Sequence, residues 1–235
     1  MLSAEEAGLV PVDKTDTRTD LVYRQIRHLL LSGGLTAGEK MTTRGLAEAM
    51  QVSGTPAREA LGRLVAEGAL EFGPNRTVQV PLLTSNQIDE IYDARILLEG
   101  LIVESAVPLR TAAQIEALEK IYADHVAAIA AEDYRASARL NFEFKFAIYQ
   151  AANRPTILRI IEGLWLRTGP HIRFVYPPGN SQIFLSYHAD CIVAIKAGDV
   201  VRAKSALVRD LMEAQGRLRL AVATKAPIAV RSSIS

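Results

Sequence analysis

Apolar residues recur at helical spacing along most of the chain, and the character of the pattern changes near residue 82. From residue 84 to residue 224 they follow one another three or four positions apart, and no segment alternates as a strand would. Breaker residues interrupt this pattern at Pro108, Asp133, 153–155, 177–179 and 198–199. The spacing predicts six helices, over residues 85–107, 111–131, 133–152, 155–174, 181–197 and 199–223.

The predicted helices carry apolar stripes that need partners. One such stripe contains Ile88, Ile91, Ile96, Leu98 and Ile102. Helices with one apolar face pack against one another, and short connections make neighbouring helices antiparallel. We therefore expect an all-α antiparallel bundle over residues 84–225, a kind of domain that holds ligands between facing helices.

Before residue 82 the pattern is mixed. One segment, residues 20–32, places Leu21, Ile26, Leu29 and Leu30 at helical spacing and ends at Gly33-Gly34, which predicts a helix. Residues 69–80 alternate apolar and polar side chains around a Gly-Pro-Asn turn, which is typical of a hairpin. We expect these elements to belong to one small module over residues 17–81.

Between that helix and the hairpin, residues 42–61 are typical of two short helices joined by a tight turn. Thr42 or Thr43 can cap the first helix, and Ser53 can cap the second through its hydroxyl. The inward stripe of the second helix would be Ala57, Ala60, Leu61 and Leu64, leaving Thr55, Arg58 and Arg63 to point elsewhere. This arrangement predicts a winged helix-turn-helix, which presents its second helix to DNA.

Composition indicates the class of protein and the cellular compartment in which we expect it. The chain has 235 residues, 49% of them hydrophobic, and a net charge of +1, so it is long enough for two domains with a substantial core. Residues 18–81 hold eight Lys or Arg against six Asp or Glu, a net charge of +2 that gives weak support to nucleic-acid binding. The single cysteine, Cys191, excludes an internal disulfide. Since the sequence shows neither a membrane-spanning run nor the order of a signal peptide, we expect a cytoplasmic protein, with mobile ends at residues 1–16 and 226–235.

Several motifs together carry a family resemblance. The N-terminal ones lie in residues 38–48 and 52–61, and the more diffuse C-terminal ones in residues 64–68, 94–99, 151–153, 188 and 194–199. With these residues the chain resembles the GntR family of transcription regulators, and its bundle resembles the FCD effector domain of the FadR branch in the six-helix form typified by VanR. The resemblance implies a mainly α homodimer that binds a double-stranded DNA operator and a small-molecule effector.

The resemblance also implies which residues contact DNA. They are Thr42, Thr43, Arg44, Ser53, Thr55, Arg58 and Arg76. Arginine can donate a bidentate pair of hydrogen bonds to guanine, and hydroxyls suit phosphate oxygens. An alternative role for Thr42 and Ser53 is capping alone, and an exposed arginine can simply be solvated.

Two positions depart from the family pattern. Relatives commonly have arginine where this chain has Gly54, and glycine in the wing where it has Thr77. Because the first change removes a side chain that reads bases and the second stiffens the wing, we expect an atypical or less stringent operator.

The effector domain departs further. Many relatives bind a divalent metal through an aspartate, a histidine four residues later and two histidines on the last two helices, and these positions read Asn141, Lys145, His188 and Asp210 here. A protonated ammonium group has no lone pair and repels a cation, so we expect no metal cofactor. We expect Lys145 to pair with Asp210, which leaves neither charge alone in a pocket of low dielectric.

The same positions predict the ligand. A small carboxylate held by Lys145 and Arg95, and oriented by His188 and Asn141, fits this set of side chains. The alternatives are an ion pair of Arg95 with Glu99, a core role for His188, a solvated Lys145, and a metal held by His188, Asp210 and Asn141 despite the lysine.

Taken together, the sequence predicts a ligand-responsive DNA-binding regulator, with repression as the expected sign, and no membrane partner. Two other classes are weighed against it. A helical interaction module could use its winged helix for protein contacts, and an enzyme could use the bundle, although no phosphate loop, nucleophile elbow or paired catalytic acids are present.

Overall fold

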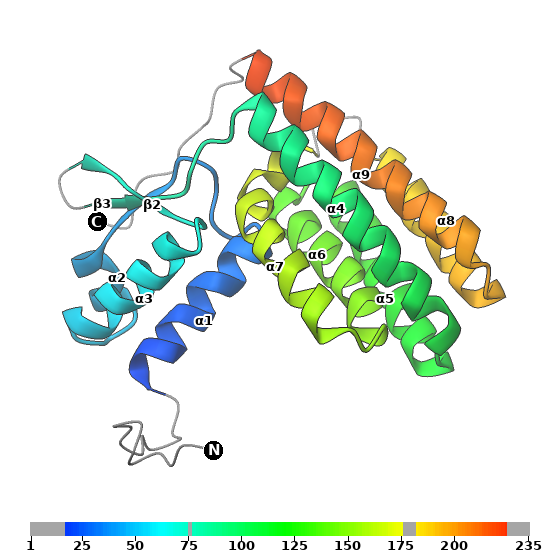
Figure 1. Cartoon of the computed structure of the whole chain (residues 1–235), viewed down its shortest axis with the longest axis horizontal. Coiled ribbons are helices and arrows are strands. Elements are labelled where there is room, and N and C mark those ends of the chain that lie inside the picture. The colour runs from blue at the N-terminus through cyan, green and yellow to red at the C-terminus, as the bar shows by residue number, and fades with distance from the viewer. Residues whose placement is uncertain (1–16, 75–76, 176–181, 225–235) are drawn as a thin grey trace, which may run out of the picture.

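The computed structural model describes residues 17–74, 77–175 and 182–224, and these form a small N-terminal domain and a larger helical domain (Figure 1). The predicted mobile ends and Arg76 lie outside the described residues. The mainly α fold, with a winged helix-turn-helix followed by a helical bundle, is confirmed.

The N-terminal domain packs three helices against a small sheet. Its elements are α1 (Arg18–Leu31), β1 (Lys40–Thr42), α2 (Thr43–Ala49), α3 (Gly54–Ala66), β2 (Glu71–Phe72) and β3 (Thr77–Gln79). The strands are antiparallel in the order β1-β3-β2, with Val78 of β3 opposite both Met41 and Phe72. The hairpin was predicted, whereas strand β1, which completes the sheet, was not.

Two predicted caps have different outcomes. The Thr42 hydroxyl accepts a hydrogen bond from the backbone N–H of Gly45 at 2.9 Å, so Thr42 caps α2 as expected. The predicted capping hydrogen bond of the Ser53 hydroxyl is absent. Ser53 is the N-cap residue of α3 with extended backbone angles, but its side chain makes no capping bond, which leaves the first turn of α3 open to an external acceptor.

The helical domain contains the six predicted helices within the described ranges. They are α4 (Ser85–Ala106), α5 (Ala112–Ala130), α6 (Tyr134–Ala151), α7 (Pro155–Thr168), α8 (Gln182–Ala197) and α9 (Val200–Ala223). A short 3-10 turn, η2 (Val107–Leu109), ends α4. The helix predicted over residues 155–174 ends earlier and continues as a second 3-10 segment, η3 (Gly169–Phe174), because Pro170 cannot donate a backbone hydrogen bond inside an α-helix.

The buried faces differ from two predicted stripes. Leu21 is 47% exposed, and α1 buries Val22, Ile26, Leu30 and Leu31 instead. On α4 the residues Ile96 and Leu98 are only half-buried, whereas the buried face carries Tyr92, Arg95 and Glu99 beside its isoleucines. Polar groups therefore sit in the core of the helical domain.

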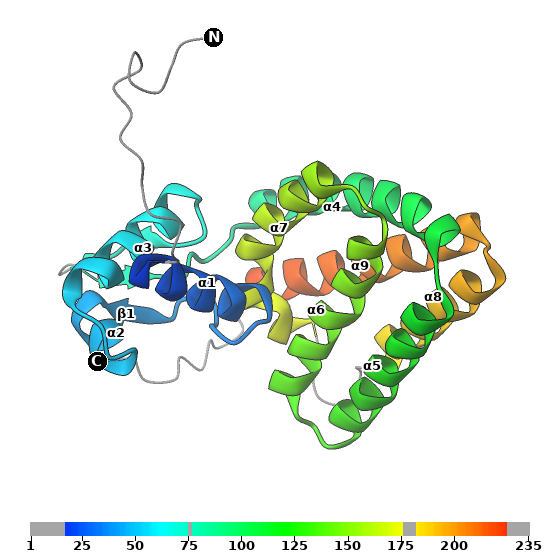
Figure 2. The same ribbon diagram turned by 90° about the horizontal axis from the view of Figure 1, so that it is seen from below.

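The two domains meet where α1 runs against α7 and η3 (Figure 2). Arg27 of α1 forms an ion pair with Glu162 of α7, with 2.7 Å between nitrogen and oxygen. The backbone N–H of Ala37 donates to the carbonyl of Pro170 at 3.2 Å. None of the helices that the structure describes is both long and apolar enough to cross a bilayer.

Candidate DNA-reading face and buried polar site

The second helix of the helix-turn-helix has two distinct faces. Ala57, Ala60, Leu61 and Leu64 are at most 2% exposed and fix α3 in the core of the domain, as predicted. Thr55 and Arg58 lie on the opposite, exposed face. Packing on one side thus holds these polar side chains outward.

A hollow of about 450 Å³ lies between α2 and α3. Its lining consists of Thr43, Arg44, Ala47, Glu48, Gln51, Val52, Gly54 and Arg58. Arg44 is 88% exposed at its side chain, and its Nε donates to Glu48 Oε1 at 2.8 Å. The face therefore offers two exposed guanidinium groups and one carboxylate, which is a donor and acceptor set suited to base edges.

The other predicted DNA contacts occupy this face or its margin. Thr43 lines the hollow, and Thr55 is exposed at the start of α3. Thr42 is half-buried and engaged as a cap. Ser53 is exposed with no capping bond.

A network around Arg95 and Glu99 forms the first half of the buried polar site. Arg95 Nε donates to Glu99 Oε1 at 2.6 Å, and the two side chains are 2% and 0% exposed. Arg95 Nη1 donates to the Thr168 hydroxyl at 3.1 Å, and Trp165 Nε1 donates to Glu99 at 2.9 Å. The Tyr149 hydroxyl also donates to Glu99. Burial opposes the charge on Arg95, yet the carboxylate of Glu99 raises the pKa of the guanidinium overall.

The alternative interpretation of Arg95, an ion pair with Glu99, therefore describes its contacts, but the pair is buried and not exposed. The ring centres of Tyr92 and Trp165 lie 4.7 and 4.4 Å from the guanidinium carbon of Arg95. These contacts hold Arg95 rigidly at the wall of the site.

Lys145 and Asp210 form the second half. Lys145 Nζ of α6 is ion-paired with Asp210 Oδ2 of α9, and both side chains are at most 4% exposed. The predicted pair is thus present, and Lys145 is not a solvated side chain. Burial raises the pKa of Asp210 although Lys145 acts against the shift.

His188 lies behind Asp210. Its Nε2 is 3.7 Å from Asp210 Oδ1, and its ring stacks on Phe144 with 4.1 Å between the ring centres. Burial first, and then the charges of His125 and Lys145, lower the pKa of His188 well below the usual value, so the ring is neutral. Within the described part of the chain, neither ring nitrogen of His188 nor Oδ1 of Asp210 has a hydrogen-bond partner.

A small cavity joins the two halves. It is lined by Tyr92, Arg95, Asn141, Lys145, Ile172, Val175, Phe184, Asp210, Leu211 and Ala214. Its free volume is about 10 Å³, close to the room that one water molecule needs. Four of the five predicted effector residues line it, whereas His188 does not.

The residues at this site do not fit a divalent metal. Lys145 occupies the position nearest Asp210, and its ammonium would repel a cation that approached the same carboxylate. Across residues 17–74, 77–175 and 182–224, no three His, Cys, Asp or Glu side chains are grouped so as to hold a metal ion.

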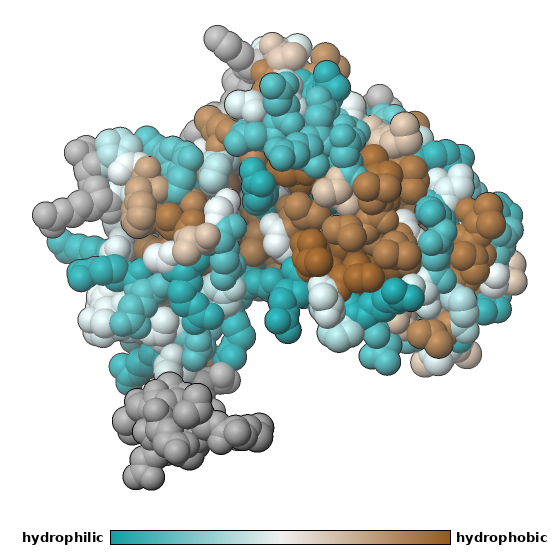
Figure 3. Space-filling model, in the orientation of Figure 1, coloured by the Kyte–Doolittle hydropathy of each residue, from teal (hydrophilic) through white to brown (hydrophobic). Residues whose placement is uncertain are grey.

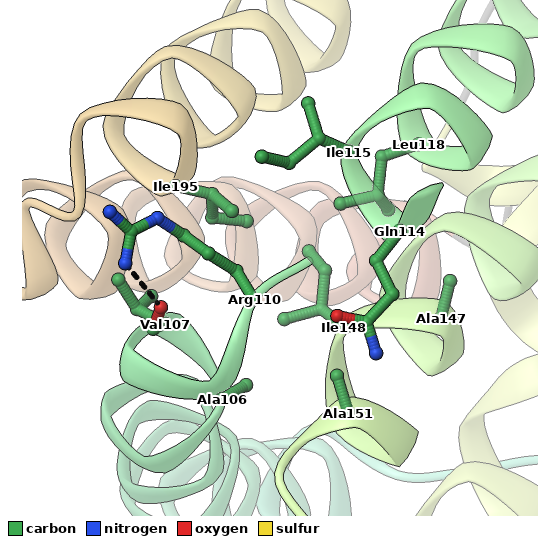
Figure 4. A pocket seen from close by; sticks show the side chains of 10 residues that line it. All are labelled: Ala106, Val107, Arg110, Gln114, Ile115, Leu118, Ala147, Ile148, Ala151 and Ile195. Carbon is green, nitrogen blue, oxygen red and sulfur yellow. Dashed lines mark hydrogen bonds between the residues drawn. The ribbon is translucent and has the colours of Figure 1, made fainter. Parts of the chain in front are cut away.

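A second cleft lies at the far end of the bundle, among η2, α5, α6 and α8 (Figure 4). Aliphatic side chains line it, together with Arg110 and Gln114. Arg110 Nη1 donates to the carbonyl of Val107 at 3.1 Å. The free volume is about 20 Å³, so this cleft is a shallow gap in the packing.

Sequence reasoning did not assign the partners that complete the Arg95 network, and it favoured a core role for Trp165. Tyr149, Trp165 and Thr168 lie 50 to 73 positions away along the chain from the residues they contact. An aromatic residue at helical spacing usually signals core packing, so no local signal identified them.

A helix-turn-helix with an exposed, arginine-bearing second helix, joined to a helical domain with a buried polar cavity, defines a DNA-binding regulator with a separate helical domain. The comparisons agree. Residues 18–80 match the family described as bacterial regulatory proteins, gntR family, and residues 90–213 match the FCD domain. The chain therefore belongs to the GntR family of transcription regulators, with an FCD domain.

Individual relatives support this assignment. The HTH-type transcriptional regulator McbR of Escherichia coli K12 is 34% identical over 186 residues, which cover 76% of this chain and 82% of that protein. The solved structure of E. coli McbR/YncC superposes with a TM-score of 0.81 at 30% identity and covers 88% of this chain and 99% of that one. The gluconate operon transcriptional repressor of Bacillus subtilis is 28% identical over 156 residues, 66% of this chain and 60% of that protein.

Proposed function

We propose that the protein is a metal-free repressor that acts in the cytoplasm and releases its operator when a small organic acid enters the buried cavity. The observation that carries this proposal is the Lys145–Asp210 pair on the cavity wall. Lys145 offers an ammonium group to a carboxylate, and aromatic and aliphatic side chains form most of the remaining wall. An acid with one carboxylate and a small apolar body matches both surfaces.

The acid would enter by taking the place of Asp210 at Lys145. Asp210 can give way by taking up the proton of the entering acid, because burial raises its pKa and its Oδ1 makes no hydrogen bond within the described residues. Arg95 donates to Glu99 and Thr168 and lines the same cavity, so its guanidinium can also face a ligand. Asn141 supplies an amide at the same wall.

Acid binding is tested by titrating acetate, butyrate and benzoate against the complex of the protein with a duplex that it selects from a random pool. We expect at least one acid to weaken operator binding by about 5- to 150-fold, the usual range of coupling between two sites. The double variant Lys145→Met/Asp210→Leu should bind the duplex and ignore the acids. Release by butyramide as effective as release by butyrate would contradict a carboxylate site.

Metal analysis tests the other half of the proposal. Protein purified without chelator should contain no stoichiometric transition metal, because Lys145 competes electrostatically with any cation at Asp210. A chelator should change neither its thermal stability nor its response to acids. Elemental analysis that finds one tightly held Zn, Ni or Mn per chain would contradict the proposal.

A homodimer is supported by an apolar face of the helical domain. Figure 3 shows hydrophobic residues gathered over α4 and α7. Leu97 and Leu101 of α4 are 73% and 39% exposed, and Ile160 of α7 is 50% exposed. Gly163 of α7 is open, because a Cβ added there would meet no neighbouring atom within 4 Å, so a second helix can approach closely. A face of this kind suits a two-fold contact between copies, which would place two winged helices on a palindromic operator.

The dimer proposal predicts the effect of a charge on this face. Leu97→Glu should shift the protein to monomers in sedimentation and weaken binding to a palindromic duplex, because a buried unpaired carboxylate is costly at an interface. Val201→Glu, at a residue that is 80% exposed on α9, is the matched control and should leave the mass unchanged. A Leu97→Glu protein with the mass of the unaltered chain would exclude this face.

A further inference from the structure

The segment from Thr168 to Val175, which contains η3, contacts the buried cavity along one side. Ile172 and Val175 belong to the cavity lining. The Thr168 hydroxyl accepts a hydrogen bond from Arg95 Nη1, which reaches the cavity from α4. Whatever enters the cavity therefore meets this segment.

The same segment contacts the N-terminal domain along its other side. Pro170 accepts the backbone hydrogen bond from Ala37, and the backbone N–H of Leu83, in the connection between the domains, donates to His171 Nε2 at 3.4 Å. A side chain built at Gly33, just after α1, would place its Cβ 2.8 Å from Ile172 Cγ2. Ile172 thus lies against the cavity and against the end of α1 at once.

Gly169 brings the two backbones together. A Cβ at this position would lie 2.3 Å from the carbonyl oxygen of Leu30 and 2.8 Å from that of Leu31, both at the end of α1. Neither is a flexible side-chain atom, so only glycine permits the observed approach of η3 to α1. The close packing of η3 against the end of α1 therefore depends on a glycine at position 169.

His171 is neutral, as its hydrogen bond from the backbone N–H of Leu83 requires. Burial lowers its pKa to about 4 although the carbonyl of Arg167 favours the proton, so the ring is neutral at physiological pH. Its Nδ1 lies 3.1 Å from the Arg167 carbonyl, which accepts the ring N–H. Nε2 is then the acceptor for Leu83.

The cavity is too small to admit an organic acid without displacing its lining. Its free volume is about 10 Å³, and most of the lining belongs to the long helices α4, α6, α8 and α9. Ile172 and Val175 instead belong to a short 3-10 segment and its end, where hydrogen bonds are fewer and less well aligned. We therefore expect an entering ligand to displace η3 before it displaces the long helices.

We propose that η3 transmits occupancy of the cavity to the DNA-binding domain, with Ile172 as the positioning residue that both the ligand and α1 contact. This inference rests on the proposed function, because it requires a ligand in the cavity. Displacement of Ile172 would shift Gly33 and the end of α1, and with them the packing of α1 on α3. The orientation of the DNA-reading face relative to the bundle would change.

The first test measures coupling, defined as the ratio of operator dissociation constants with and without saturating butyrate or benzoate. Ile172→Ala should reduce a ratio of about 5- to 150-fold to less than about twofold, since the link is removed while the cavity is enlarged. Leu211→Ala is the matched control, because Leu211 lines the same cavity from α9. It should retain the ratio of the unaltered protein. Equal ratios in Ile172→Ala and the unaltered protein would overturn the proposal.

The second test needs no ligand. Gly169→Ala should change operator affinity by about tenfold or more, the size of a coupling in the usual range, in protein that circular dichroism shows to be folded. Gly216→Ala, at a helical glycine with nothing within 4 Å, should leave operator affinity unchanged. Unaltered operator affinity in Gly169→Ala would overturn the proposal. If no acid binds the unaltered protein, the effector class is wrong, and Gly169→Ala still decides whether η3 sets the DNA-binding domain.

Discussion

Replacing Lys145 by methionine is expected to lower the free energy of unfolding by about 3–5 kcal/mol, the usual loss when one partner of a buried ion pair is removed. The reason is that Asp210, at 3% exposure, would be left as an uncompensated charge. Denaturant unfolding followed by circular dichroism measures the change. Proton uptake by Asp210, whose pKa burial already raises, limits the loss at low pH.

Two further variants distinguish the stability contributed by the buried Lys145–Asp210 pair from the general effect of removing a lysine. Lys145→Met/Asp210→Leu should recover most of the stability, because replacing both partners of a buried pair by apolar residues is often neutral or stabilising. Lys196→Met removes an exposed pair with Glu119, whose side chains are 50% and 47% exposed, and should cost less than about 1 kcal/mol. A Lys145→Met variant no less stable than Lys196→Met would mean that the buried pair carries no energetic weight.

Replacing Arg58 by alanine is expected to weaken operator binding by about 5- to 150-fold, which corresponds to the 1–3 kcal/mol of a bidentate contact with a base. Arg58 is exposed on α3 and lines the hollow that α3 forms with α2. Because Gly54 supplies no side chain on the same face, few other groups can compensate. Fluorescence anisotropy with a selected duplex and with single-base variants measures affinity and discrimination together.

Arg63 provides the matched control on the same helix. Its guanidinium pairs with Asp20 at 2.8 Å and lies 4.0 Å from the centre of the Tyr23 ring, so it faces α1. Arg63→Ala should leave discrimination between duplexes unchanged. If Arg58→Ala also discriminated as the unaltered protein does, the base contact assigned to Arg58 would be wrong.

The helices were predictable because their boundaries are marked by local chemistry. Thr84 and Thr111 begin α4 and α5 with capping boxes, and Gly198 ends α8 with a φ of 73° that favours glycine. Strand β1 was not predictable, since three residues are too few to show alternation. Gly169 and Pro170 mark the early end of α7 in the sequence, but the prediction followed the apolar spacing and extended the helix past them.

The buried site was predictable only in part. Positions shared with the family pointed to Lys145 and Asp210, and opposite charges that replace a metal's ligands suggest a pair. The burial of Arg95 with Glu99 could not be read from spacing, because an arginine and a glutamate four residues apart usually form a solvated pair on a helix surface. Only the packing of α4 against α7 and α9 decides that they lie inside.

The depth of the Lys145–Asp210 pair gives DNA binding and the proposed acid binding different dependences on ionic strength. Salt screens charges that face solvent and has little effect on buried ion pairs such as Lys145–Asp210. Binding to the phosphate backbone of DNA, in contrast, weakens steeply as the salt concentration rises. Concentrated salt should therefore release the protein from DNA and have little effect on the acid binding that we propose for the helical domain.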